Sequence, residues 1–223
     1  MMVKVNRTYP APASLAMEAA KGIQGSYNKS DVIEQLKKDF ADKCYICEMQ
    51  GLQDGIVEHL IPHHGGKHMD LMFAWDNLFW SCSHCNGLKN RAEYEGNIID
   101  CCKDDPEKHI NCVYTNTDTV EIHIRDAQES SRLTAKLVGE AFNLVNTGIR
   151  ESATTIRKNA LRTEMRIFFK MLNQYRQNKN KLNLRLVSSR LRIKTAFAAF
   201  KRDYIRMHSN EYPELQDFLA AKI

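Results

Sequence analysis

The chain has 223 residues, 43% of them hydrophobic and 26% charged, a composition typical of a globular protein that excludes a wholly disordered chain. No apolar run reaches the roughly 18 residues of a membrane helix, and the polar first residues lack the apolar stretch of a secretion signal. Seven cysteines, an odd number, argue against a disulfide framework, so we expect a cytoplasmic protein with reduced thiols and no membrane partner.

The net charge of +5 is unevenly distributed along the chain. Residues 131–206 hold 18 lysines and arginines against 4 acidic residues, whereas the remainder holds 14 against 23. A basic segment of this strength is typical of proteins that bind phosphate groups or an acidic partner surface. A solvated basic helical face is the alternative that charge alone leaves open.

The first residues predict an extended arm, because Pro10 and Pro12 restrict the backbone to extended conformations. Apolar residues then recur at helical spacing, and Asp31 with Glu34 resembles a capping pair at the start of that helix. We expect this helix to end just before the first cysteine. Residues 1–28 are therefore predicted to be an N-terminal arm with a short helix.

The middle of the chain predicts short, irregular elements. Residues 56–57 favour a short strand and residues 86–94 a short helix. Two β-prone runs, residues 111–114 and 120–124, flank a polar stretch and predict a hairpin. We expect one unit over residues 29–126.

From Ser131 the apolar residues follow the period of a helix. They predict three helices, with breaks at Gly148 and at residues 178–180. The three apolar stripes are Leu133, Leu137, Val138, Ala141, Leu144 and Val145; Ile156, Leu161, Met165, Phe168, Phe169 and Leu172; and Val187, Leu191, Ala196, Phe197, Phe200 and Tyr204. Residues 127–223 are predicted to be a basic helical domain, and the whole chain to be α+β.

Four cysteines form two Cys-x-x-Cys pairs, Cys44 with Cys47 and Cys82 with Cys85, separated by 34 residues. Two residues between the cysteines let both thiolates of a pair face one ion, and two pairs complete a tetrahedron. We therefore predict a structural Zn²⁺ site, because four protein ligands leave no open position for a substrate. Ordinary buried thiols do not explain the paired spacing, and a redox motif needs no second pair.

Further motifs lie between and after the cysteine pairs. In chain order they are Glu58-His59 followed by Pro62, Gly65-Gly66, Asn77-Leu78, and Cys85-Asn86 followed by Lys89. This order resembles the HNH, or ββα-metal, nuclease motif in its zinc-knuckle form, over residues 44–89, about a fifth of the chain. The resemblance implies a zinc-stapled ββα-metal core and an endonuclease that hydrolyses phosphodiester bonds.

The resemblance also implies roles for the matching residues. His59 is the general base, for which an imidazole with a pKa of about 6.5 is suited. Glu58, on the opposite face of the strand, binds Mg²⁺ or Mn²⁺, and Asn86 is the second ligand of that ion. Asn77 braces the loop that carries His59. Many relatives have aspartate or histidine in place of Glu58 and histidine in place of Asn86, and the oxygen ligands here favour Mg²⁺ or Mn²⁺.

The remaining polar residues of the region have less specific interpretations. Lys89 and Arg91 either hold substrate phosphate or cap a helix. His84 is expected at the surface, because four cysteines already satisfy a zinc ion. No specific role follows for His63, His64, His68, Cys101, Cys102 and Cys112.

The overall layout, with Trp75 before Asn77 and a long helical tail, is similar to a narrower group. These are the HNH subunits (PtuB-type proteins) of Septu and retron-associated antiphage defence systems. In that group the nuclease works with an ABC-type ATPase and attacks nucleic acid during phage infection. The resemblance implies that residues 1–13 or the helical tail docks on the ATPase, and that the basic tail guides the substrate.

The main prediction is therefore a metal-dependent HNH endonuclease, acting on DNA as the effector of an antiphage complex. The alternatives are a non-catalytic zinc-knuckle module that binds nucleic acid or protein, a free-standing restriction-type nuclease, and a tRNA-cleaving effector. A base beside a carboxylate, as in Glu58-His59, argues against the binding module. The lack of a recognisable helix-turn-helix or second finger argues against the free-standing enzyme.

Overall fold

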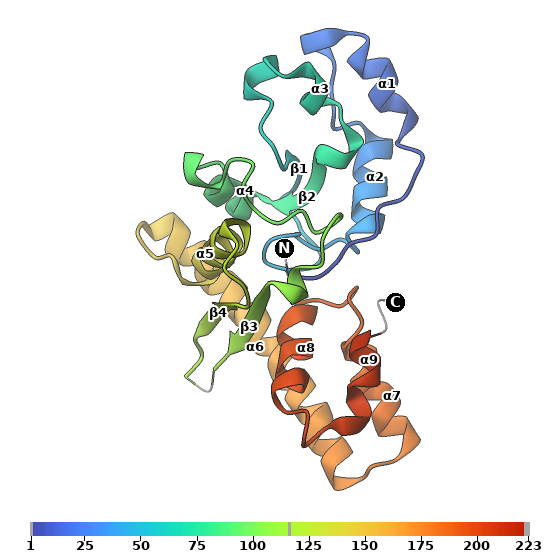
Figure 1. The fold of residues 1–223 in the computed structure, drawn as a ribbon, viewed down its shortest axis with the longest axis vertical. Helices are drawn as coiled ribbons and strands as arrows, with labels where there is room; N and C mark the ends of the chain where they lie inside the picture. The colour runs from blue at the N-terminus through green and yellow to red at the C-terminus, as the bar shows by residue number, and fades with distance from the viewer. Residues whose placement is uncertain (1, 116, 221–223) are drawn as a thin grey trace.

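The computed structural model describes residues 2–115 and 117–220. Met1 in the predicted arm, Asn116 in the predicted hairpin loop and residues 221–223 of the predicted helical domain lie outside the described residues. The described chain is α+β, with two separate two-stranded antiparallel sheets among the helices (Figure 1). None of the helices in the described ranges combines the length and apolar character needed to cross a bilayer.

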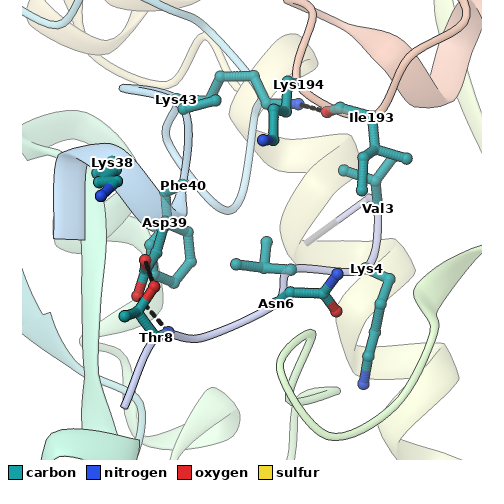
Figure 2. Close-up of a pocket in the computed structure, with 12 residues that line it drawn as sticks. Val3, Lys4, Asn6, Thr8, Lys38, Asp39, Phe40, Lys43, Ile193 and Lys194 are labelled. Carbon is teal, nitrogen blue, oxygen red and sulfur yellow. Dashed lines mark hydrogen bonds between the residues drawn. The ribbon is translucent and has the colours of Figure 1, made fainter. Parts of the chain in front are cut away.

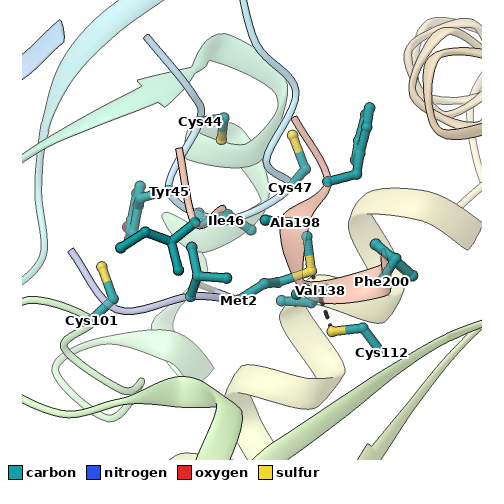
Figure 3. Close-up of a cluster of buried hydrophobic side chains, with 14 of the residues drawn as sticks. Met2, Cys44, Tyr45, Ile46, Cys47, Cys101, Cys112, Val138, Ala198 and Phe200 are labelled. Atoms are coloured by element: carbon teal, nitrogen blue, oxygen red, sulfur yellow. Dashed lines mark hydrogen bonds between the residues drawn. The ribbon is translucent and has the colours of Figure 1, made fainter. Parts of the chain in front are cut away.

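Residues 2–12 of the arm contain no helix or strand, but the first of them are packed against the rest of the molecule. Figure 2 shows it beside the end of α2 (Ser30–Asp39) and Ile193, around a cavity of about 320 Å³. Met2 is 1% exposed, and its sulfur lies 3.5 Å from Cys112 Sγ within the buried cluster of Figure 3. The start of the arm is therefore part of the core, whereas Tyr9 is exposed.

Helix α1 (Ala13–Ala19) is hydrogen-bonded to α2 through Asp31. The predicted capping role of Asp31 is wrong, because α2 begins at Ser30 and Asp31 lies within its first turn. Its carboxylate instead accepts hydrogen bonds from the backbone nitrogen and Oγ of Ser14, at 3.2 and 2.6 Å. Helix α2 ends before Cys44, as predicted.

Strands β1 (Gly55–His59) and β2 (Leu78–Cys82) pair antiparallel, with His59 opposite Leu78. The connection contains the short helix α3 (Met69–Met72), and α4 (Ser83–Lys89) follows β2 directly. The order is therefore strand, strand, helix. Helix α4 begins and ends earlier than predicted. Strand β2 was not predicted, since all of its residues are buried and it lacks the alternation of a half-exposed strand.

The C-terminal half confirms the predicted hairpin and modifies the predicted helices. The hairpin is β3 (Ile110–Tyr114) with β4 (Val120–Ile124). The helices are α5 (Glu129–Asn143), α6 (Gly148–Gln177), α7 (Lys181–Arg190), α8 (Ala198–Met207) and α9 (Asp217–Ala220). The third apolar stripe thus forms two helices, because the chain turns at Phe197, whose φ is 49°.

The packing is continuous across the domain boundary predicted at residue 126. Helix α5 packs on β4 and α4, and α8 packs on β3. The buried ammonium of Lys43 pairs with Glu48 at 2.7 Å and donates to the Ile193 carbonyl at 2.6 Å (Figure 2). The cysteine-rich region and the C-terminal helices therefore share one core.

Candidate functional site

The four cysteines of the two Cys-x-x-Cys pairs form one buried cluster. The sulfurs of Cys44, Cys47, Cys82 and Cys85 all lie within 4.8 Å of one another. A tetrahedral zinc ion with Zn–S bonds of about 2.3 Å separates its sulfurs by about 3.8 Å, so this grouping fits such an ion. The cluster can hold a structural metal such as zinc, and it joins the turn after α2 to the start of α4.

His59 ends β1 and lines a pocket of about 310 Å³. Its Nε2 lies 3.0 Å from the Met72 carbonyl oxygen, which can only accept, so Nε2 carries the proton and donates. Burial lowers the pKa of His59 to about 4, so the ring is neutral at neutral pH and Nδ1 keeps its lone pair. The Tyr27 ring meets the imidazole edge to face, with ring centres 4.4 Å apart.

Glu58 points to the opposite side of the sheet from His59, as strand alternation requires. The Tyr45 hydroxyl donates to its carboxylate, and Lys89 Nζ lies 3.5 Å from Glu58 Oε2. Both side chains of this ion pair are 1% exposed. Burial raises the pKa of Glu58, the nearby charge of Lys89 opposes this rise, and burial lowers the pKa of Lys89.

Asn86 lies on α4 three residues before Lys89, and therefore on the same helix face. Because Lys89 contacts Glu58, this face of α4 is turned toward Glu58. The pocket is indeed lined by Glu58, His59 and Asn86 together. A carboxylate and an amide oxygen at one pocket suit a hard divalent cation such as Mg²⁺ or Mn²⁺, which would share or displace the contact with Lys89.

Asn77 stabilises the segment that connects β1 and β2 by hydrogen bonds to its backbone. It is not among the residues that line the pocket. Its Nδ2 donates to the carbonyls of Ile61 and Leu71, at 2.8 and 3.0 Å, and its Oδ1 accepts from the Ile61 nitrogen at 2.8 Å. These bonds hold Leu71 in place. The carbonyl of the next residue, Met72, orients the His59 ring. Asn77 thus acts on the imidazole through the loop.

Lys89 and Arg91 differ in what they contact. The burial of Lys89 contradicts the prediction that it holds substrate phosphate, since its ammonium is occupied by Glu58 and by the His59 carbonyl. Arg91 caps α4 instead, because its Nε donates to the Leu88 carbonyl at 3.0 Å. Its guanidinium also forms an ion pair with Glu140 of α5.

Some residues to which the sequence assigned no role line the pocket or contact Glu58. Tyr27, His63 and His64 line the pocket, and Tyr45 donates to the carboxylate. Only Tyr45 carries a signal in the sequence, since it lies inside the first Cys-x-x-Cys pair. Tyr27 comes from the loop before α2, distant from β1 in the sequence, whereas His63 and His64 follow the end of β1 closely.

Two residues near the cysteine cluster, His84 and Arg157, are more buried or more closely bound to it than the sequence predicts. His84 is half-buried rather than at the surface, and burial lowers its pKa to about 4. Its Nε2 is buried, with no hydrogen-bond partner in the described part of the chain. Arg157 of α6, to which no role was assigned, donates from Nη2 to Cys82 Sγ at 2.9 Å. Its spacing of four residues from buried Leu161 is the signal that places it on the inner face of α6.

The pocket therefore brings together a neutral imidazole, a carboxylate and an amide beside a potential metal cluster. Such a set can take a proton from water and hold a divalent cation. No family model, curated protein or solved structure matches this chain.

Proposed function

We propose that the protein is a metal-dependent endonuclease of the HNH type that hydrolyses phosphodiester bonds in nucleic acid, with DNA as the main substrate. The observation that carries the proposal is the strand–strand–helix unit, whose residues Glu58, His59 and Asn86 all line one pocket. The adjoining four-cysteine cluster and the order of these elements are what the HNH resemblance implies.

His59 supplies the base in this proposal. Its Nδ1 takes a proton from the attacking water, and the bond from Nε2 to the Met72 carbonyl keeps the ring in the tautomer that this step needs. The same carbonyl stabilises the imidazolium that forms. Glu58 and Asn86 would hold Mg²⁺ or Mn²⁺, which when bound bears the charge that develops on the leaving oxygen.

The proposal is tested by cleavage of plasmid DNA and of tRNA with Mg²⁺ or Mn²⁺. Removal of a general base costs about 10²- to 10⁴-fold in rate, and we expect a loss of that order in His59→Ala. His123→Ala, which changes an exposed histidine on β4, is the matched control and should cleave normally. Full activity of His59→Ala, with zinc content and folding unchanged, would remove the base from the mechanism.

The resemblance to PtuB-type proteins extends the proposal to a cytoplasmic effector subunit of an antiphage complex with an ABC-type ATPase. The basic segment, residues 131–206, supports contact with nucleic acid or an acidic partner surface. Co-purification with the product of the adjacent reading frame, followed by assays on DNA and tRNA, tests partner and substrate together. Cleavage that needs no partner would favour a free-standing restriction-type nuclease.

The ion pair between Lys89 and Glu58 favours a second candidate, a zinc module that binds nucleic acid or protein without cutting it. In that case the lysine, and no metal, neutralises the carboxylate. Binding of Mn²⁺, followed by its electron paramagnetic resonance, separates the two candidates. A site that is present in the wild type and lost in Glu58→Gln supports the nuclease, whereas its absence from the wild type supports the binding module.

A further inference from the structure

Arg157 is a buried cation with an unusual set of partners. It lies on α6, is 4% exposed, and donates from Nη2 to Cys82 Sγ at 2.9 Å. Its Nη1 donates to the Ala153 carbonyl at 2.7 Å, and its Nε has no hydrogen-bond partner among the residues that the structure describes. Within residues 2–115 and 117–220, no carboxylate forms an ion pair with this guanidinium.

A buried guanidinium without an anion is strongly unfavourable, because burial removes its hydration. Of the two groups in the described residues that accept hydrogen bonds from Arg157, the sulfur of Cys82 is the one that can carry a negative charge. Four neutral thiols would leave the arginine uncompensated. Four thiolates around a divalent ion instead carry a net charge of about −2, which a neighbouring guanidinium partly neutralises. Arginine and cluster therefore each supply the charge that the other lacks.

We propose that Arg157 is the counter-ion of the four-cysteine metal centre. Its N–H bond to the Cys82 thiolate stabilises the bound metal, lowers the reactivity of that sulfur, and makes the packing of α6 depend on the metal. Groups that hydrogen-bond to metal ligands commonly tune both affinity and ligand orientation in this way. The inference depends on the cluster holding a metal ion and is independent of nuclease activity.

The first test compares Arg157→Met and Arg157→Lys with the wild type. Zinc transfer to a chelator and alkylation of Cys82 by iodoacetamide, followed by mass spectrometry, should both be about 10- to 100-fold faster in Arg157→Met. Arg157→Lys keeps the charge and should fall between the two. Leu161→Ala, on the same buried face of α6, weakens the packing but keeps the arginine, so it should accelerate alkylation less than Arg157→Met does. A wild-type rate in Arg157→Met, or equal acceleration in Leu161→Ala, would overturn the proposal.

The second test uses the wild type and holds even where the variants do not fold. Hydrogen exchange is measured before and after zinc is removed by a chelator. The amides of residues 153–161 should lose protection before those of α7, because the loss of the thiolate charge leaves Arg157 buried without an anion. Unchanged protection of residues 153–161 in the metal-free protein would refute the coupling. Neither test uses a cleavage assay. Both can therefore be interpreted even if the protein has no nuclease activity.

Discussion

Replacing Asn77 with alanine is expected to release the connection between β1 and β2. The side chain is 6% exposed and forms three hydrogen bonds to backbone atoms of Ile61 and Leu71. At about 1 kcal/mol for each bond, Asn77→Ala should lower the free energy of unfolding by about 3 kcal/mol. For a chain of this size, that loss corresponds to a fall in the melting temperature of about 6–12 °C.

Urea unfolding measures the loss, and Asn143→Ala provides the matched control. Asn143, an exposed residue of α5, forms a single side-chain bond, from Nδ2 to the Val120 carbonyl at 2.9 Å. Its replacement should cost about 1 kcal/mol or less. Asn77→Asp sharpens the test, because it keeps the acceptor for the Ile61 nitrogen and turns an oxygen toward two carbonyls. Equal costs for Asn77→Ala and Asn143→Ala would refute the reasoning, as would an Asn77→Asp variant as stable as the wild type.

Two further predictions concern the cysteine cluster and a buried histidine. Cys47→Ser should have less bound zinc in metal analysis and a lower yield of folded protein. Cys112→Ser, at a cysteine buried outside the cluster, should keep the wild-type zinc content and yield. Zinc retained at the wild-type level in Cys47→Ser contradicts a four-sulfur site. Hydrogen bonds that the ring nitrogens of His109 donate to Asp126, and next to Asp104, raise the pKa of His109. A raised pKa adds stability below the unfolded value of about 6.5 and loses it as pH rises through the folded value. Urea unfolding should therefore show the advantage of the wild type over His109→Asn shrinking as the pH rises above about 6.5, and a constant advantage contradicts this.

The sequence predicted those features that depend on neighbouring residues or on spacing. The hairpin over residues 110–124 follows from β-prone runs on either side of a polar loop, and it is confirmed. The paired cysteines predicted one cluster, and the four sulfurs do meet. Both predictions use local chemistry that distant packing does not alter. The catalytic ion and the nuclease activity remain predictions.

What the sequence did not predict depends on contacts between distant elements. The second helical stripe was taken to include Ile156, but this side chain is 53% exposed and Arg157 faces inward in its place. Hydrophobicity alone favours isoleucine, and only the position of the cysteine sulfur explains why an arginine is buried there. In the sequence, Lys89 likewise resembles an exposed lysine. In the structure it is buried beside Glu58, which lies 31 residues earlier in the chain.

The long-range hydrogen bond of Lys43 has a consequence for how the protein folds during synthesis. Its ammonium bonds to the carbonyl of Ile193, 150 residues further along the chain. A ribosome adding about 5–20 residues per second needs about 8–30 s to cover that stretch. The four cysteines have all been translated well before the end of this interval, while the helices that finally bury them are still incomplete. A nascent chain can therefore acquire its metal ion before the core closes around it.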